Sequence, residues 1–149
     1  MRYSEIVDSG LYVAVKFSKE TIDDLENLVN DLVEHGMSNP VDDFHATVVY
    51  SRKNIDWDTA TDIDETARPI GFEKFDTKED KKCLVLLLTS DYLSRRFNLA
   101  MEKGATYDFD DYRPHITLSY DCGDFDISKL SIPDFTVHIS EEYSSPLED

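Results

Sequence analysis

His45-Ala-Thr-Val-Val-Tyr50 and His115-Ile-Thr-Leu-Ser-Tyr120 are two copies of one pattern: histidine, an apolar residue, threonine, two further residues and tyrosine. The copies lie about half a chain apart in a sequence of 149 residues that contains four histidines. Because strand side chains alternate between two faces, residues two apart point the same way. Each copy therefore predicts a strand that presents a histidine and a threonine side by side.

The alternation assigns every residue of both copies to a face. The reactive faces are expected to hold His45, Thr47 and Val49 in the first copy and His115, Thr117 and Ser119 in the second. The reverse faces are expected to pack on a core through Ala46, Val48, Tyr50, Ile116, Leu118 and Tyr120. A reactive pair on a rigid, half-buried element is what a preorganised site requires.

Two imidazoles with adjacent hydroxyls suit acid–base chemistry on a phosphodiester. Imidazole titrates near pH 6.5, so one ring can accept a proton while another donates one. Threonine hydroxyls can donate hydrogen bonds to phosphate oxygens as negative charge builds on them. We therefore expect the two His-x-Thr strands to face each other across a cleft that holds one phosphodiester.

The order of elements repeats around the two motifs. A strand at 11–17 precedes a helix with Ser18 as its N-cap and Gly36 as its stop, and the first motif follows. Residues 52–65 are expected to form a loop, and strands are expected at 70–77 and 83–88. A second helix is capped by Ser90 and buries Leu93, Phe97, Ala100 and Met101, and the second motif strand and a last strand at 135–143 follow. This order predicts an α+β fold of two pseudo-symmetric β-α-β lobes, with antiparallel sheets flanking a central cleft.

Composition places the chain among single-domain proteins. A length of 149 residues with 40% hydrophobic residues fits one packed domain spanning 1–149. The longest apolar run, 83–88, is too short to span a membrane, and the first ten residues do not resemble a secretory signal. Two cysteines without zinc spacing indicate reduced thiols, which favours a cytoplasmic location.

The charge constrains the substrate. The formal net charge is −17, with 15 Lys and Arg against 32 Asp and Glu. A protein that binds long RNA or DNA normally presents a basic surface, so this composition disfavours a long nucleic acid. A small anion needs only a few local cations, and Arg52 and Arg113 beside the motifs are candidates. The sequence contains no signal for oligomeric state.

The two motifs, with the runs 10–17, 44–53, 104–109 and 114–121, resemble the two-histidine (2H) phosphoesterase superfamily and, within it, the bacteriophage anti-CBASS phosphodiesterases. The resemblance implies hydrolysis of cyclic di- and trinucleotide messengers of a bacterial antiviral defence, without a metal or other cofactor. It implies that His45 and His115 are the acid–base pair and that Thr47 and Thr117 bind the phosphate oxygens. The sequence favours neither histidine as the base.

Weaker correspondences suggest substrate-binding residues. Tyr12 matches a pocket tyrosine of the family, Glu142 a position that accepts from a base edge, and Phe75 a position where the family tends to carry tryptophan. The family's tryptophan near the C-terminus has no counterpart in the last residues, 145–149. Arg113 is included for its charge beside the second motif.

Three other functions remain open at this stage. The same fold serves RNA phosphodiesterases that act on 2′,3′-cyclic or 2′-5′ linked ends, and a non-catalytic protein could bind the messenger without cutting it. A metal hydrolase could use the two histidines with Asp42, Asp43 and Asp121, although the spacing typical of zinc sites is absent. His35 and His138 lack the threonine partner and are expected at the end of the first helix and on the last strand.

Overall fold

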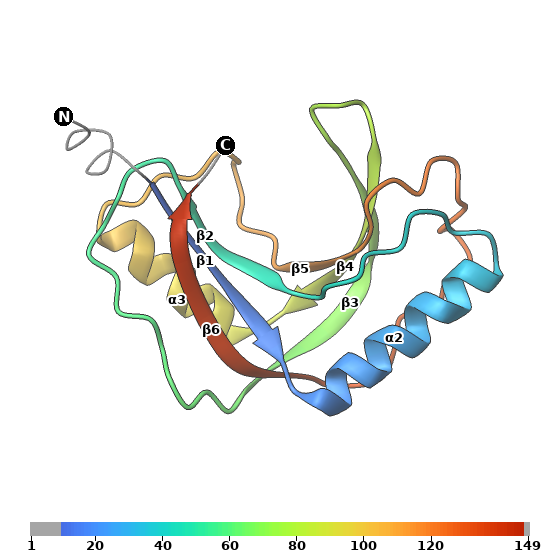
Figure 1. Cartoon of the computed structure of the whole chain (residues 1–149), viewed down its shortest axis with the longest axis horizontal. Coiled ribbons are helices and arrows are strands. Elements are labelled where there is room, and N and C mark those ends of the chain that lie inside the picture. Colours follow the sequence, from blue (N-terminus) through green and yellow to red (C-terminus); the bar gives the residue numbers. More distant parts are fainter. Residues whose placement is uncertain (1–9, 148–149) are drawn as a thin grey trace.

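The computed structural model describes residues 10–147 of the chain (Figure 1). In chain order the elements are β1 (Gly10–Phe17), α2 (Lys19–Glu34), β2 (Ala46–Ser51), β3 (Glu65–Asp76), β4 (Lys82–Thr89), α3 (Asp91–Glu102), β5 (His115–Ser119) and β6 (Val137–Leu147). The strand predicted at 70–77 begins earlier, at residue 65, and the strand predicted at 135–143 lies at 137–147. Both bounds are set by pairing with strands that are distant in the sequence.

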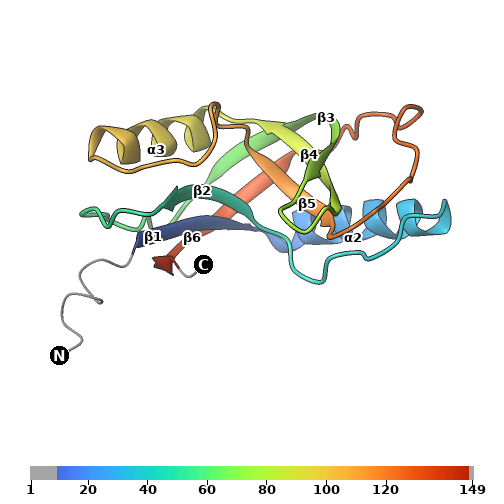
Figure 2. The ribbon, with the colours of Figure 1, turned by 90° about the horizontal axis from the view of Figure 1, so that it is seen from above.

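The strands form one antiparallel sheet in the order β2-β1-β6-β3-β4-β5. Residues 65–67 of β3 pair with β6 and residues 68–76 pair with β4, so this strand joins two halves, β2-β1-β6 and β3-β4-β5. The halves curve toward each other until the edge strands β2 and β5 are in contact (Figures 1 and 2). The predicted α+β class is confirmed, and the two predicted sheets are continuous through β3.

Both helices begin at the predicted caps. The Ser18 hydroxyl accepts from the backbone N–H of Thr21, and the Ser90 hydroxyl accepts from that of Leu93. The C-cap of α2 is His35, as expected, and His138 lies on β6. The helices bury a stripe made of Thr21, Leu25, Val29 and Leu32 in α2 and of Leu93 and Ala100 in α3. Met101, predicted on the buried stripe of α3, is instead 40% exposed.

The two halves are interlocked by the segments that precede the motif strands. The N–H of Val41, in the loop before β2, donates to the backbone oxygen of Leu118 in β5. In the reciprocal contact, the N–H of Thr106, in the loop before β5, donates to the hydroxyl of Ser51 in β2. In Figures 1 and 2, α3 lies against the half that contains β2, and α2 lies beside the other half. The repeated motif therefore corresponds to a pseudo-symmetric arrangement in which the loop before each motif strand bonds to the motif strand of the other half.

Each motif strand contains a β-bulge directly after its threonine. Against β1, the partners of Thr47 and Val49 are consecutive residues, so Val48 is the extra residue of β2. Against β4, the partners of Thr117 and Ser119 are consecutive, so Leu118 is the extra residue of β5. A bulge shifts the alternation of faces for every residue that follows it.

Because of the bulges, four residues after the threonines lie on the opposite face from the one predicted. Val49 and Ser119, predicted beside the reactive pairs, are buried, at 2% and 0% exposure. Tyr50 and Tyr120, predicted on the core face, lie respectively in a cleft described below and on the surface at 52% exposure. The residues up to and including each bulge follow the prediction, because the core contains Ala46, Val48, Ile116 and Leu118 at 0% exposure.

No helix within residues 10–147 has the length and apolar character needed to cross a bilayer. The segment examined for a secretory signal, residues 1–10, lies almost wholly outside the described residues.

Candidate active site

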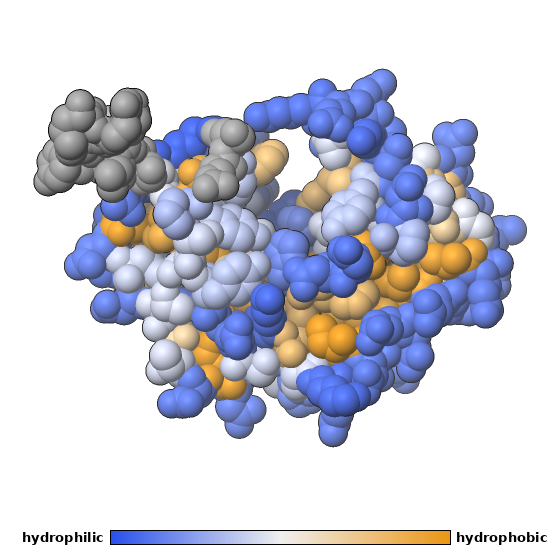
Figure 3. Space-filling model, viewed as in Figure 1, coloured by the Kyte–Doolittle hydropathy of each residue, from blue (hydrophilic) through white to orange (hydrophobic). Residues whose placement is uncertain are grey.

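A cleft of about 480 Å³ lies where the two halves of the sheet meet. Figure 3 shows the molecule hollowed at this place, beside the β3–β4 hairpin. Thr47 of the first motif and His115 of the second both line this cleft, although 68 positions separate them in the sequence. The rest of the wall combines four aromatic side chains with five charged ones: Tyr50, Phe75, Tyr107 and Phe109, and Glu73, Lys74, Asp76, Asp111 and Arg113.

The environment of His115 favours the neutral imidazole. Its Nδ1 lies 2.8 Å from the backbone oxygen of Arg113. Because a carbonyl oxygen only accepts, the neutral ring carries its proton on Nδ1 and keeps a free lone pair on Nε2. Burial lowers the pKa of His115 below the ordinary 6.5, and the charges of His45 and Arg113 lower it further, against the hydrogen bond to the Arg113 oxygen.

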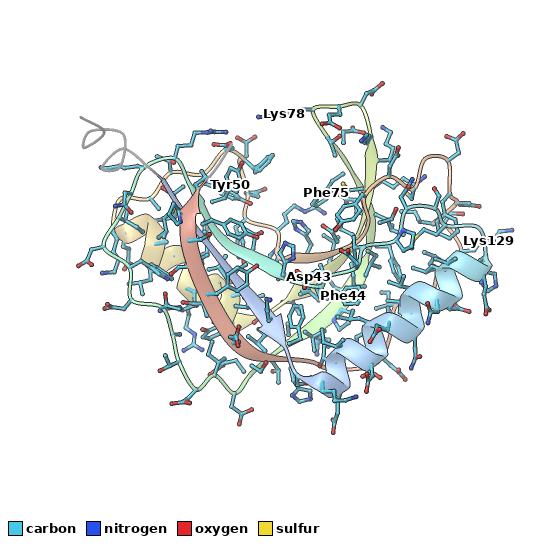
Figure 4. All side chains as sticks on the ribbon, viewed as in Figure 1. Asp43, Phe44, Tyr50, Phe75, Lys78 and Lys129 are labelled. Atoms are coloured by element: carbon cyan, nitrogen blue, oxygen red, sulfur yellow. The ribbon has the colours of Figure 1, made fainter. Side chains whose placement is uncertain are left out.

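His45 stands directly before β2 and is oriented in a similar way. Its Nδ1 is buried, forms no hydrogen bond within the described part of the chain, and lies 3.5 Å from Oδ2 of Asp43. Asp43 lies near the centre of Figure 4, where the two halves meet. Since 37% of the His45 side chain is exposed while Nδ1 is covered, Nε2 is the nitrogen available to a bound molecule.

The two histidines share one electrostatic environment. The charge of His45 is among the causes that lower the pKa of His115, which places the rings close enough to interact. Contact between β2 and β5 supplies this proximity. The two motif strands meet at a common cleft, which Thr47 of the first and His115 of the second line, whereas His45 and Thr117 are not among its lining residues.

The threonines occupy equivalent positions in the two bulged strands. The Thr47 hydroxyl lies 3.2 Å from the hydroxyl of Tyr12, and the Thr47 backbone oxygen accepts from the Tyr112 hydroxyl at 2.9 Å. Thr117 is half-buried and lies between His115 and the bulge. Thr47 is thus contacted at its hydroxyl by a tyrosine of β1 and at its backbone oxygen by a tyrosine of the loop before β5.

Phe75 and Arg113 form one wall of the cleft beside His115. The Phe75 ring meets the His115 imidazole edge-on at 4.9 Å, and the Arg113 guanidinium lies 5.4 Å from the Phe75 ring centre. Both Nη atoms of Arg113 donate to the carboxylate of Glu73, and this hydrogen bonding lowers the pKa of Glu73. Phe75 therefore shields the histidine from water, and Arg113 reaches the cleft with its charge already paired.

Tyr12 belongs to an aromatic surface on the same face as Thr47. Its ring lies 6.4 Å from that of Tyr50 and 6.3 Å from that of Tyr143. The three tyrosines come from β1, β2 and β6 and continue the aromatic character of the cleft along that half of the sheet. This position keeps Tyr12 among the candidate substrate-binding residues.

Glu142 does not belong to the cleft. Its side chain is 0% exposed, and Arg96 binds it through two hydrogen bonds, of 3.0 and 2.7 Å. Trp57 Nε1, the Ala60 N–H and the Tyr92 hydroxyl donate to the same carboxylate. Five donors from the protein satisfy both oxygens, so the expected contact with a base edge is wrong. The position of Glu142 in the sequence of β6 does not show that Arg96 of α3 lies beside its carboxylate.

The cations flanking the motifs are also engaged. The Nε and Nη2 atoms of Arg52 donate to the two carboxylate oxygens of Asp108, at 3.2 and 2.8 Å. Within residues 10–147, no group of three or more His, Cys, Asp or Glu side chains is placed to hold a metal ion.

Sequence reasoning missed two aromatic residues of the cleft, Tyr107 and Phe109. They lie in the loop immediately before the second motif, in a run of aromatic and acidic residues at 107–112. The spacing of aromatic side chains in that run was a signal, but only the fold shows that this loop crosses to the other half of the sheet.

Comparison with known proteins decides the family. The chain matches the model of the family described as anti-CBASS protein Acb1 over residues 9–149. The chain belongs to the Acb1 anti-CBASS family. The match confirms the resemblance to bacteriophage anti-CBASS proteins that was drawn from the two motifs and their flanking residues.

Individual Acb1 relatives are similar over most of the chain. Anti-CBASS protein Acb1 of Escherichia phage RB16 is 47% identical over 125 residues, covering 83% of this chain and 70% of that protein. The proteins of the same name from Salmonella phage S16 and Enterobacteria phage T4 are 45% and 43% identical, each covering 93% of this chain and 89% of the relative. Among solved structures, the apo form of E. coli LigT is similar with a TM-score of 0.48 and 14% identity, covering 94% of this chain and 95% of LigT.

Proposed function

We propose that this protein is a metal-independent phosphodiesterase that hydrolyses small cyclic di- and trinucleotides, and that it thereby counters the bacterial CBASS defence in the cytoplasm of the host cell. The observation that carries the proposal is the meeting of the two His-x-Thr strands at one cleft, which Thr47 of the first strand and His115 of the second line. Membership in a family named for anti-CBASS action supports the substrate class.

In the proposed first step, Nε2 of His115 removes the proton of a ribose 2′-hydroxyl. The 2′-oxygen bonds to the adjacent phosphorus, and the bond from phosphorus to the 5′-oxygen of the next nucleotide breaks. Nε2 of His45 donates its proton to that leaving oxygen. The ring is opened, with a 2′,3′-cyclic phosphate at one end and a 5′-hydroxyl at the other.

In the second step the same groups act in reverse. His45, now neutral, removes a proton from water, and the resulting oxygen attacks the phosphorus of the cyclic phosphate. The bond from phosphorus to the 2′-oxygen breaks, and protonated His115 returns its proton to that oxygen. The product is a linear nucleotide with a 3′-phosphate, and both histidines regain their starting states.

The assignment of His115 as the first base rests on its environment. A ring with a lowered pKa and a free Nε2 is neutral near pH 7, which the first proton transfer requires. His45 has its Nδ1 buried beside the carboxylate of Asp43 and its Nε2 available, so the donation to the leaving oxygen is assigned to Nε2 of His45. The hydroxyls of Thr47 and Thr117 donate to the non-bridging oxygens as the phosphorus gains a fifth bond.

Two alternatives make different predictions. An RNA phosphodiesterase of the same fold would prefer oligomers with 2′,3′-cyclic or 2′-5′ linked ends, which the net charge of −17 disfavours by repelling a long polyanion. A binding protein without catalysis would release intact nucleotide when denatured. It would also have no requirement for a histidine on each of the two motif strands.

The test is incubation of the protein with a panel of cyclic di- and trinucleotides in excess chelator, with products identified by mass. We expect linear products with 3′-phosphate ends and no cleavage of a ring made from 2′-deoxynucleotides. Quantitative recovery of every ring after denaturation would contradict the proposal, and so would a requirement for added metal ion. A cyclic-phosphate-ended RNA oligomer serves as the competing substrate.

A further inference from the structure

Phe109 is the most exposed large apolar side chain in the described part of the chain, at 68%. It lies in the loop between α3 and β5, and it lines the same cleft as Thr47 and His115. An aromatic ring that stays in water keeps an unfavourable apolar surface, and burial against a ligand would remove it. Exposure at the wall of a cleft therefore points to a ligand contact.

The loop that carries Phe109 is anchored on both sides of it. Tyr107 packs on Phe97 of α3 at 5.0 Å, and Asp108 receives two hydrogen bonds from Arg52, the residue directly after β2. On the other side, Tyr112 stacks on Phe97 with an interplanar angle of 2° and a centroid distance of 4.4 Å. The segment is fixed at these points, so the exposed ring is held in place before any ligand arrives.

The contacts of the Phe109 ring leave room for a partner. It meets Tyr107 in an edge contact at 5.5 Å, and no other ring contact is made to it within the described residues. Phe75, another aromatic of the cleft, is already engaged by the His115 ring and the Arg113 guanidinium. Figure 4 shows Tyr50 and Phe75 on opposite halves of the molecule with open space between them.

We propose that Phe109 is a base-stacking residue, which holds a nucleobase of the bound cyclic nucleotide beside the reacting phosphate. This inference rests on the proposed function and adds to it the group that recognises the substrate. A protein with net charge −17 gains little from general attraction to a phosphate ring. Stacking is insensitive to that charge and accepts any base, because every base presents a π-face.

The experiment measures binding of a cyclic dinucleotide made from 2′-deoxyadenosine, which lacks the attacking hydroxyl, in chelator. Loss of one stacking contact weakens binding on the order of 10- to 100-fold. We expect this loss for Phe109→Ala and also for Phe109→Leu, which keeps apolar bulk without a flat π-face, whereas Phe109→Trp binds as the wild type does. Ile132→Ala is the matched control, since Ile132 is 55% exposed and does not line the cleft.

A second measurement separates stacking from a structural effect. With the ribose form of the substrate, the loss in Phe109→Ala is expected in the Michaelis constant and not in the single-turnover rate at saturation. Wild-type affinity in Phe109→Ala would overturn the inference while the proposed reaction stands, and equal losses in the Ala and Trp variants would overturn it too. A wild-type protein that binds the deoxy ring through Phe109 but cuts no ribose ring would overturn the proposed reaction alone.

Discussion

Replacing Glu142 by alanine is expected to destabilise the fold severely. The carboxylate is 0% exposed and accepts five hydrogen bonds, two of them from Arg96, whose side chain is only 16% exposed. Removing one partner of a buried ion pair leaves the other charge uncompensated, which costs about 3–5 kcal/mol. The same pair holds Arg96 at 4.4 Å from the Trp57 ring, so the loop 52–64 also loses an anchor.

Urea denaturation at pH 7 measures this loss. For small proteins the free energy of unfolding falls by about 1–3 kcal/mol per molar urea, so the midpoint is expected to drop by at least about 1 M. The neighbouring Glu141→Ala removes an exposed carboxylate and is expected to change stability by less than about 0.5 kcal/mol. A midpoint for Glu142→Ala equal to that of Glu141→Ala would refute the argument that Glu142 is structural.

Three further predictions concern the cleft. Because burial lowers the pKa of His115 and the neutral ring is the proposed base, the cleavage rate should rise with pH through a midpoint below 6.5. Phe75→Ala should admit water to the ring and move that midpoint upward toward 6.5. An unmoved midpoint in a pH–rate series would contradict the shielding of His115 by Phe75. Thr47→Val, which removes a hydroxyl at nearly constant shape, should lower the single-turnover rate about 10²- to 10³-fold with little change in affinity, and an unchanged rate would show that its hydroxyl is not used. In Figure 4, Lys78 extends from the tip of the β3–β4 hairpin toward the other half of the sheet, and it makes no ion pair within residues 10–147. Lys78→Ala should therefore weaken nucleotide binding about 2- to 5-fold at low salt and leave it unchanged at high salt. Lys129→Ala, at the far end of the molecule, is its control, and equal effects of the two would indicate net charge alone.

Local chemistry made much of the fold predictable. Ser18 and Ser90 cap their helices because a hydroxyl in extended backbone meets the free N–H groups of the first turn, a rule confined to a few residues. Alternation predicted the faces of the motif strands as far as the bulge residues, and Ile116 and Leu118 are buried as predicted. The predicted meeting of the motif strands at one cleft followed from their being two copies of one unit.

The predictions that were wrong concern residues whose positions depend on contacts between distant segments of the chain. The bulges at Val48 and Leu118 are mismatches with β1 and β4, so no pattern within β2 or β5 shows them. Glu142 alternates like any strand residue, and its buried pairing appears only when α3 brings Arg96 beneath β6. Phe109 enters the cleft because its loop is fastened to the opposite half, which sequence periodicity does not encode.

The most direct measurement is the single-turnover cleavage rate of a cyclic dinucleotide by His45→Ala, by His115→Ala and by the variant with both changes. We expect each single variant to lose about 10²- to 10⁴-fold while still binding the 2′-deoxy ring, and the double variant to lose little more, because the two rings act in one proton exchange. Cleavage at near wild-type rate by either single variant would contradict the account.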